Sequence, residues 1–391
     1  MSKRPQLAVI STVYFSPSHS DVFVTRWLEP LESDRAFGWP PDGLNKPRTE
    51  IASAHIIEFT DKDVGREILQ KYNIPLYSTV REALTLGGDK LAVDGVLLIG
   101  EHGTYPYNEF GQKMYPRREL FDEIITVFRE SGRSVPVFND KHLSYNPASA
   151  MHMVEAAKEL AFPLMAGSSI PTCGMLEPWQ LPDKAPLKEA VFLYFGGCEM
   201  YGCHSIEFAE SLVARRAGGE AGIKNVTAYC GDFFWEADKA GVWPSDLVEL
   251  ALKESIHHED GEWRKNIKSP NDAKVLMDKW PAAYVFEHLD GFRSIHLNMN
   301  GHIKDFTTAL RDKNGAVYSG CSAYSRHGEH DFYANAAIMD AKIEEFMLTG
   351  KPPYPIEHYL LTTLATDAAV RALFQPGITI ETPTLALPYK I

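Results

Sequence analysis

Residues 93–99 read VDGVLLI, an apolar run with the length of a strand that is buried on both faces. Similar runs lie at Leu7–Thr12, Val135–Phe138 and Phe162–Ala166, and helical patterns separate them, among them Arg118–Ser131. Buried strands that alternate with helices are typical of βαβ units, in which the strands pair in parallel. The first part of the chain therefore predicts a parallel sheet.

The remaining segments of this first part carry weaker signals. We expect strands at Ile51–Phe59 and at the short Ile74–Tyr77, and helices at Asp21–Leu31 and Pro147–Leu160. Residues 33–49 are dense in Gly, Pro, Asp and Asn, a composition that predicts a long loop. Loops of this length in compact domains often serve as lids over a site.

After about residue 170 the pattern changes to prolines and longer alternating segments. We expect antiparallel strands, with turns at Asp290-Gly291 and Asn314-Gly315, and then two helices. The expected strands are Ile223–Phe234, Ala282–Glu287, Phe292–Asn298 and Phe306–Tyr318, and the expected helices are Asp331–Leu348 and Ile356–Phe374. The predicted fold is therefore α/β: a Rossmann-like parallel-sheet domain over residues 1–168, and an α+β domain with a largely antiparallel open sheet over residues 169–391.

The composition limits what such a protein does. With 39 Lys and Arg against 52 Asp and Glu, the formal net charge is −13, which disfavours binding to nucleic acid or to an anionic membrane surface. Five cysteines in 391 residues fit a reducing compartment better than a disulfide scaffold. No apolar run approaches the ~20 residues of a membrane span, and the apolar stretch near the N-terminus is too short for a signal peptide. We therefore expect a cytoplasmic protein.

Five segments, taken in order, resemble the Gfo/Idh/MocA family of sugar oxidoreductases. They resemble the family's second βαβ unit, the strand and loop beside the nicotinamide, the Glu-Lys-Pro segment, the helix with the substrate-side histidine, and the C-terminal helical pair. The segments are FTDKDVGREILQKYNIPLYSTVREAL (59–84), VDGVLLIGEHGTYP (93–106), VPVFNDKHLSYNPASAMHMVEAAKELAFPLMAGSS (135–169), GGCEMYGCHSIEFAE (196–210) and FMLTGKPPYPIEHYLLTTLATDAAVRA (346–372).

The resemblance implies an NAD- or NADP-dependent oxidoreductase that acts on a hydroxyl of a sugar, glycoside or cyclitol and forms homodimers or homotetramers. It also implies that Lys141 bonds the reacting hydroxyl and that His204 acts as the general base or beside it. Desolvation lowers the pKa of a lysine just past a buried strand, which suits proton transfer. The residues by themselves also allow a solvated loop lysine and a core histidine bonded to the backbone.

The stretch after the first strand departs from the family pattern. Family members have a G-x-G-x-x-G-like turn, where glycine lets the backbone approach the cofactor pyrophosphate, but residues 11–21 contain no glycine. Hydroxyls of Thr12, Ser16 and Ser18 are the candidate cofactor contacts there, and the serines can equally cap the next helix. Asp61 is expected to end the second strand and to bond the adenosine ribose, which favours NAD, or else to cap the following helix.

Further candidates follow the run VDGVLLI. Glu101 and His102 come directly after it, at the edge where open α/β sheets bind ligands, and we expect them to be acid–base groups. Aromatic rings and Arg side chains are suited to binding carbohydrate-like substrates, although an Arg can also simply open a surface helix. The candidate substrate-binding residues are Tyr105, Tyr107, Arg117 and His142.

Three functions stay open at this point. The first is the NAD(P)-dependent oxidoreductase. The second is a non-redox lyase, epimerase or hydrolase for sugar-like substrates, with or without a divalent metal, and the third is a catalytically silent subunit. The glycine-free turn favours the second or third, whereas Lys141 and His204 favour an enzyme. Cys198, Cys203 and His204 lack the spacing of a zinc site, so no metal ligands are assigned.

Overall fold

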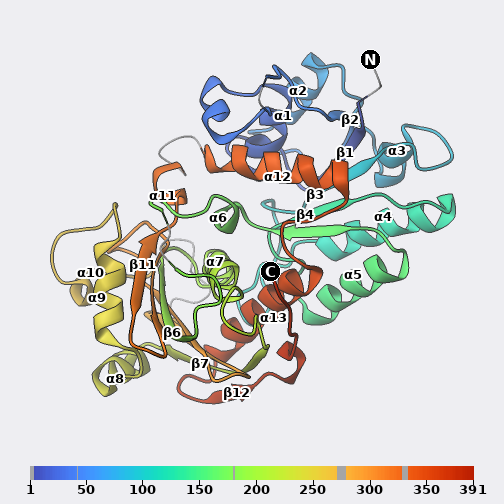
Figure 1. Ribbon diagram of the computed structural model, residues 1–391. Helices are drawn as coiled ribbons and strands as arrows, with labels where there is room; N and C mark the ends of the chain where they lie inside the picture. Colours follow the sequence, from blue (N-terminus) through green and yellow to red (C-terminus); the bar gives the residue numbers. More distant parts are fainter. Residues whose placement is uncertain (1–3, 42, 179–180, 271–278, 328–332) are drawn as a thin grey trace. The chain divides into compact units, whose positions relative to one another are not determined.

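The computed structural model describes residues 4–41, 43–178, 181–270, 279–327 and 333–391 (Figure 1). The chain forms two compact units: residues 1–106, 114–172 and 329–359 make up the first, and residues 107–113, 173–328 and 360–391 the second. This division differs from the expected single boundary at residue 168. Both units are discontinuous, because a late segment of the chain packs with the first sheet and a short early loop belongs to the second unit.

The first unit is built on five parallel strands in the order β2-β1-β3-β4-β5, which confirms the predicted parallel sheet. All residues of β3, β4 and β5 are buried, as expected for strands with both faces covered. The strand order reverses between β1 and β3, the point at which open α/β sheets bind ligands. The strands are β1 (Gln6–Ser11), β2 (Glu50–Ile56), β3 (Gly95–Ile99), β4 (Val137–Asp140) and β5 (Leu164–Gly167).

Helices follow each of these strands, and local sequence fixes several of their ends. The helix α5 starts at Pro147 behind Asn146, whose side chain accepts a hydrogen bond from the Ser149 N–H (3.1 Å), and α4 ends at Gly132 in the left-handed region. The helices of this unit are η1 (Asp21–Thr25), α1 (Arg26–Leu28), η2 (Glu32–Phe37), α2 (Gly65–Lys71), α3 (Val80–Thr85), α4 (Arg117–Ser131), α5 (Pro147–Glu159), α6 (Ser169–Thr172) and α12 (Asn335–Thr349).

The second unit holds a seven-stranded sheet in the order β11-β10-β6-β9-β8-β7-β12. Only β6 and β9 pair in parallel and every other neighbouring pair is antiparallel, which confirms the largely antiparallel sheet. The strands are β6 (Leu187–Tyr194), β7 (Ile223–Cys230), β8 (Ala282–His288), β9 (Arg293–Asn298), β10 (Thr307–Asp312), β11 (Val317–Cys321) and β12 (Thr379–Glu381).

Alternation along β6 sends neighbouring side chains to opposite faces of this sheet. Val191 and Leu193 join a buried cluster with Trp243 and residues of α8 and α9, whereas Phe192 packs against Phe208 of α7 with ring centroids 6.1 Å apart. Helices therefore lie on both faces. The helices are α7 (Gly202–Val213), α8 (Asp232–Ala240), α9 (Ser245–Lys253), α10 (Trp263–Asn266), α11 (Tyr324–His327) and α13 (Ile356–Ala372), with the short η5 (Pro383–Leu385) near the C-terminus.

Two expected strands differ from the observed elements. Residues 74–77 make only an isolated bridge to β2, because Pro75 has no N–H to continue a ladder. The strand expected over 223–234 ends at Cys230, since Gly231 has a φ of 56° and α8 begins directly after it.

Other differences are smaller. The loop expected over 33–49 contains η2, and the helix expected from Asp331 is observed from Asn335, with Asp331 itself outside the described residues. Within the described ranges, no helix combines the length and the apolar character that crossing a bilayer requires.

Candidate functional site

The central strands of the first unit end in buried polar residues. Thr12 follows β1, Glu101 follows β3 and Lys141 follows β4. The Thr12 hydroxyl donates a hydrogen bond to the Glu101 carbonyl over 2.6 Å, which ties together the ends of two neighbouring strands. Because the strands are parallel, these residues share one edge of the sheet, beside the reversal in strand order. We call the polar side chains gathered there the edge cluster: His19, Glu101, His102, Arg117, Asp140 and Lys141.

Glu101 is the centre of the edge cluster. Lys141 Nζ donates to Glu101 Oε1 over 2.9 Å, and the Arg117 guanidinium pairs with the other carboxylate oxygen. All three side chains are at most 6% exposed. Burial alone would raise the pKa of Glu101, but the charges of Lys141 and Arg117 outweigh it and hold that pKa well below its usual range. Glu101 is therefore a carboxylate between two cations.

Backbone features hold the two cations in place. Lys141 has a left-handed φ of 60° and exchanges two backbone hydrogen bonds with Gly167 at the end of β5. Arg117 is the first residue of α4, and its side chain packs against Gly100. A Cβ at position 100 would lie only 2.7 Å from Arg117 Cγ, so this position requires glycine. The guanidinium lies 4.8 Å from the ring centroid of Tyr115. Its Nε and Nη1 have no hydrogen-bond partner among the described residues.

A second pair joins the turn after β1 to the end of β4. His19 Nδ1 lies 2.6 Å from Asp140 Oδ2, with the Asp140 side chain 2% exposed and the His19 side chain 26% exposed. A buried carboxylate that holds one imidazole nitrogen leaves the other nitrogen available for proton transfer. Asp140 thus fixes the orientation of the His19 ring.

His102 completes the edge cluster. Its φ of 66° turns the ring toward the end of β1, where it contacts Phe15 and His19 edge-on with centroids 5.7 and 5.2 Å apart. Burial, and after it the charge of His19, lowers the pKa of His102 to about 4, so the ring is neutral at pH 7. Its Nε2 is buried and has no partner within the described part of the chain.

The turn after β1 bonds largely to itself. The Ser18 hydroxyl accepts hydrogen bonds from the N–H groups of Phe15 (3.1 Å) and of Asp21, the first residue of η1 (3.4 Å). The N-cap position of η1 is Ser20, whose side chain makes no capping bond. Ser16 is exposed and Thr12 is buried, and a cofactor role for Thr12, Ser16 and Ser18 stays a prediction.

Tyr14 of the same turn packs into the interior. Its hydroxyl shares a 2.9 Å hydrogen bond with the Thr25 hydroxyl, and its side chain leaves no room for a Cβ on Gly65 (2.6 Å). The turn thus has the bulky Tyr14 and no glycine, and the glycine that makes room for this side chain is Gly65 of α2.

The strand β2 ends at Ile56, so the expectation that Asp61 ends this strand is wrong. Asp61 lies in an exposed turn five residues later, because β2 loses its ladder partner where β1 ends. The acidic residue beside the strand end is Glu58, whose carboxylate accepts hydrogen bonds from the Thr104 N–H (3.0 Å) and hydroxyl (2.9 Å). A ribose contact from Asp61 stays a prediction.

The expected substrate-binding residues are distributed over both units. Tyr105 stacks edge-on near Tyr115 (5.7 Å), and burial raises its pKa to about 12. His142 is half-buried directly after Lys141. Tyr107 is 43% exposed and belongs to the second unit.

His204 also belongs to the second unit. It lies in the first turn of α7, half-buried, with its ring edge-on to Tyr201 (5.9 Å) and Phe306 (6.2 Å). Lys141 lies in the first unit, so the expectation that Lys141 and His204 meet at one substrate stays a prediction. Cys198 and Cys203 are both buried.

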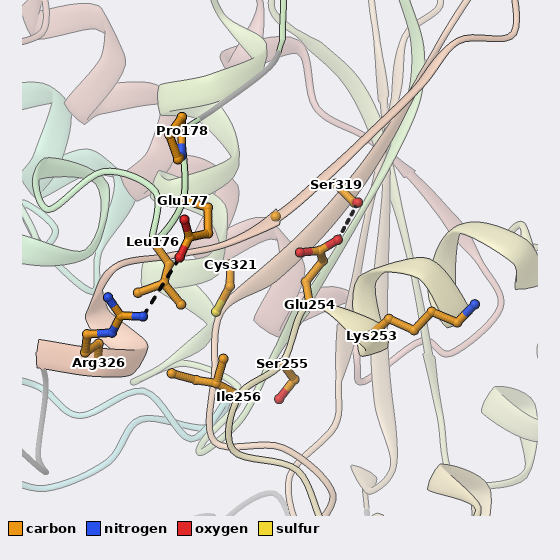
Figure 2. A pocket seen from close by; sticks show the side chains of 11 residues that line it. Leu176, Glu177, Pro178, Lys253, Glu254, Ser255, Ile256, Ser319, Cys321 and Arg326 are labelled. Carbon is orange, nitrogen blue, oxygen red and sulfur yellow. Dashed lines mark hydrogen bonds and ion pairs between the residues drawn. The ribbon is translucent and has the colours of Figure 1, made fainter.

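The second unit has a cavity of about 280 Å³ beside the edge strand β11 (Figure 2). Two polar contacts lie along it: the Ser319 hydroxyl donates to Glu254 over 2.7 Å, and Arg326 lies 3.9 Å from Glu177. Lys253 is directed away from both pairs (Figure 2). Four of the polar side chains that line this cavity are thus paired with one another.

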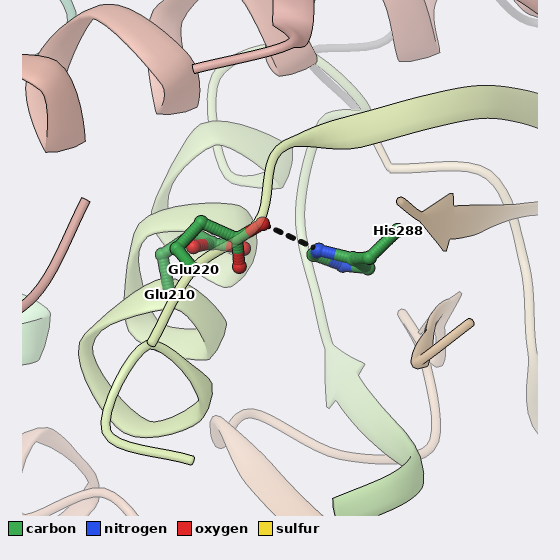
Figure 3. Close-up of side chains that lie close together, drawn as sticks. All are labelled: Glu210, Glu220 and His288. Carbon is green, nitrogen blue, oxygen red and sulfur yellow. Dashed lines mark hydrogen bonds and ion pairs between the residues drawn. The ribbon is translucent and has the colours of Figure 1, made fainter. Parts of the chain in front are cut away.

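A buried acidic cluster in the same unit brings Glu210, Glu220 and His288 within 4.8 Å, close enough to hold a metal ion (Figure 3). Glu220 already accepts hydrogen bonds from His288 Nδ1 (2.9 Å) and Arg216 Nη1 (2.7 Å). Burial, with the neighbouring Glu220 charge, raises the pKa of Glu210 well above its usual range. A guanidinium and a retained proton therefore balance the charge that a metal would otherwise balance.

Sequence reasoning missed His19 as a site residue. His19 and Asp140 are 121 positions apart and come from strands that are not neighbours in the sheet. The available signal was position: His19 follows β1, Asp140 ends β4, and the carboxyl ends of parallel strands share an edge.

Comparisons with solved structures find the same fold over nearly the whole chain. GenD2 from gentamicin A biosynthesis, solved in complex with NAD, is 14% identical with a TM-score of 0.58, covering 98% of this chain and 97% of its own. Scyllo-inositol dehydrogenase from Lactobacillus casei, with bound NAD(H) and scyllo-inositol, is 11% identical with a TM-score of 0.57 (97% and 99%). An oxidoreductase from Agrobacterium radiobacter in complex with NAD+, L-tartaric acid and magnesium is 12% identical with a TM-score of 0.52 (97% and 98%).

No protein-family model and no curated protein matches the sequence. The likeness to these three proteins, at identities of 11–14%, shows that the chain has their fold.

Proposed function

We propose that this protein is an oxidoreductase that acts on a hydroxyl of a sugar, glycoside or cyclitol with an NAD-type cofactor. The observation that carries the proposal is the pairing of Lys141 with Glu101, buried at the strand-order reversal of a sheet whose structural neighbours are dehydrogenases. Ligands of open α/β sheets bind at this edge.

The donors of the edge cluster fit the polar groups of such a cofactor and its substrate. Arg117 has two buried nitrogens without a partner among the described residues, and His102 has one. A buried polar atom without a partner is costly, and acceptor oxygens of a bound ligand would satisfy it. We propose that Thr12, Ser16, Ser18, Lys141 and Asp61 hold the cofactor, and that Tyr105, Tyr107, Arg117 and His142 bind the substrate. A bound nicotinamide would supply the acceptor or donor of the hydride.

In this proposal Lys141 bonds the reacting hydroxyl oxygen and exchanges its proton. Glu101 orients the amine, and Arg117 keeps the carboxylate neutralised whenever Lys141 has given up its proton. His102, neutral at pH 7, can donate or accept a hydrogen bond beside it without adding charge. His204 is the second acid–base group, taken from the family resemblance.

A turnover assay tests the proposal. The protein is mixed with NAD+ or NADP+ and a panel of inositols, sugars and glycosides, and nicotinamide absorbance is followed. We expect turnover with at least one polyol, and a loss of about 100-fold or more in Lys141→Met. Lys158→Met is the matched control, because Lys158 of the same unit pairs with Glu357 at the surface. An inactive wild type, or full activity in Lys141→Met, would contradict the proposal.

One observation favours a second candidate, a non-redox lyase, epimerase or hydrolase for sugar-like substrates. The N–H groups of Phe15 and Asp21, in the turn where pyrophosphate-binding glycines are expected, donate to Ser18, and the Phe15 ring lies against His102. Such an enzyme would use Glu101, His102, Lys141 and His204 without nicotinamide. Product analysis on the same panel, in the absence of any nucleotide and with or without added Mg²⁺, distinguishes it from the oxidoreductase.

A further inference from the structure

We propose that Phe110 anchors the loop after β3 on α13, and that this anchor positions Arg117 against Glu101 in the edge cluster. Phe110 and Arg371 are then positioning residues that act through Arg117. The proposal deepens the oxidoreductase function stated above and rests on it. The steps from Phe110 to Glu101 are a self-bonded hairpin, its contact with α13, and the packing of Arg117 on a neighbouring ring.

Residues 106–114 form a hairpin that bonds to itself. At its base, the Met114 N–H donates a hydrogen bond to the Pro106 carbonyl over 2.9 Å. At its turn, Asn108 Oδ1 accepts from the N–H groups of Phe110 (3.0 Å) and Gln112 (3.0 Å), and the Asn108 amide donates to Gln112 Oε1 (2.8 Å). A side chain that bonds the backbone of its own turn fixes that turn. We therefore expect the 106–114 hairpin to move as one body.

The ring of Phe110 anchors this hairpin on the end of α13. The Arg371 guanidinium lies 4.2 Å from the centroid of the Phe110 ring, and the Phe374 ring lies edge-on to it at 5.4 Å. Arg371 is itself held, because its Nε donates to both carboxylate oxygens of Asp367 (2.9 and 2.8 Å). Cation–π and edge-on aromatic contacts are favourable and directional. The turn of the hairpin therefore has a fixed place on α13.

The anchor acts on the first unit through the chain itself. Residues 107–113 belong to the second unit, whereas the residues directly before 107 and after 113 belong to the first. Tyr105 and Tyr115 flank the hairpin, and their rings meet edge-on with centroids 5.7 Å apart. Tyr115 follows directly on the base of the hairpin and is 5% exposed. A shift of the hairpin therefore displaces Tyr115.

Tyr115 supports the guanidinium of Arg117. Arg117 Cζ lies 4.8 Å from the centroid of the Tyr115 ring, and the guanidinium pairs with Glu101. Its Nε and Nη1 have no hydrogen-bond partner in the described ranges of the chain. Because one ion pair does not fix the orientation of a planar guanidinium, this orientation depends on the ring that packs against it. Release of the hairpin should therefore loosen Arg117 from Glu101.

Hydrogen–deuterium exchange of the full-length protein, without substrate, tests the anchor. We expect Phe110→Ala to speed the exchange of residues 114–120 by about fivefold or more, because Tyr115 and the first turn of α4 lose their support. Phe110→Tyr keeps the ring and should keep the wild-type rate. The matched control is Phe59→Ala, because Phe59 makes the same kind of contact with Arg66 (4.9 Å) outside the hairpin. This control should leave the exchange of residues 114–120 unchanged.

A double-mutant cycle tests the action through Arg117, with the best polyol of the panel and NAD+ as substrates. We expect Phe110→Ala to lower kcat/KM about fivefold in the wild type, but by less than about twofold in Arg117→Met, where the supported side chain is absent. A purely structural loss would lower kcat/KM by the same factor in both backgrounds. Arg371→Gln leaves Phe110 in place and covers the case in which Phe110→Ala does not fold. It should give the same pattern.

The two measurements separate the anchor from the proposed function. Unchanged exchange of residues 114–120 in a folded Phe110→Ala, or an equal loss of kcat/KM with and without Arg117, would overturn the anchor and leave the oxidoreductase intact. Absence of any wild-type turnover would overturn the proposed function and the catalytic role of the anchor with it. The exchange rates would still report whether Phe110 holds the segment that carries Arg117.

Discussion

Nζ of Lys141 and Oε1 of Glu101 lie 2.9 Å apart at the carboxyl edge of the parallel sheet, and both side chains are almost fully excluded from water. Arg117 pairs with the other oxygen of the same carboxylate. Removing one partner of a buried ion pair leaves an uncompensated charge, whereas removing both does not. The edge cluster is therefore expected to matter for stability as well as for chemistry.

Lys141→Met should lower the free energy of unfolding by about 3 kcal/mol, since Glu101 then keeps only Arg117. The double variant Glu101→Gln/Lys141→Met should be destabilised by less than the sum of the two single variants, because the Lys141–Glu101 bond can be lost only once, although it also leaves the buried Arg117 without its carboxylate. Urea unfolding of the two single variants and the double variant measures the coupling. Simple additivity of the two losses would show that the pair does not interact.

His102 should make the protein less stable in acid. Its pKa in the folded state is about 4, below the ordinary 6.5, so the unfolded chain takes up a proton that the folded chain refuses. The contribution is fully present above the unfolded pKa and is lost as pH falls toward 4, by about 3 kcal/mol in total. His102→Asn, a residue that tolerates the φ of 66°, should flatten this part of the stability profile. An identical pH profile in wild type and variant would contradict the assignment.

Asp340 should act in the opposite direction. It is fully buried in α12, neither carboxylate oxygen has a partner among the described residues, and burial raises its pKa well above the usual range. A group with a raised folded pKa stabilises below its unfolded pKa, and that contribution is lost as pH rises through the folded pKa. Asp340→Asn should therefore gain stability relative to wild type as pH is raised from 5 to about 8. Thermal unfolding at several pH values measures the gain, and a loss that grows with pH would refute it.

The cluster of Glu210, Glu220 and His288 should not respond to metal. Arg216 already pairs with Glu220, so a divalent ion would have to displace a buried guanidinium. We expect Zn²⁺ or a chelator to leave the melting temperature unchanged, and Arg216→Met to lower the free energy of unfolding by about 3–5 kcal/mol. A melting temperature that rises with Zn²⁺ and falls with chelator would show a metal centre instead.

The parallel sheet, and two of the residues at its carboxyl edge, could be predicted from the sequence because strands that are buried on both faces appear in it as apolar runs. Once 93–99 and 135–138 are parallel strands, Glu101 and Lys141 must end at the same edge, and the structure pairs them. The same reasoning failed for Phe234, because a short aromatic run fits a strand and a buried helix equally well. Gly231, with its positive φ, was the signal that separated β7 from α8.

The pairing of His19 with Asp140 could not be predicted from spacing. It depends on which side chain of the nine-residue segment between β1 and η1 reaches past β3 to β4, and this is a matter of tertiary packing, to which the contact of Phe15 with His102 belongs. The position of Asp61 was also beyond sequence reasoning. Asp61 was expected to end β2, but β2 ends where its last residue, Ile56, pairs with the last residue of β1, Ser11. Element ends and side-chain partners across strands are decided by contacts that no local pattern contains.

Calorimetric titration of NAD+ into the wild-type protein tests the central claim, that the edge cluster serves nicotinamide-dependent chemistry. We predict saturable binding of one NAD+ per chain, weakened about 10-fold or more in Lys141→Met, which loses a charge-assisted contact worth at least about 1.4 kcal/mol. If a folded wild-type protein gives no heat of binding with either NAD+ or NADP+, the proposed oxidoreductase function is contradicted. The non-redox enzyme would then be the better proposal.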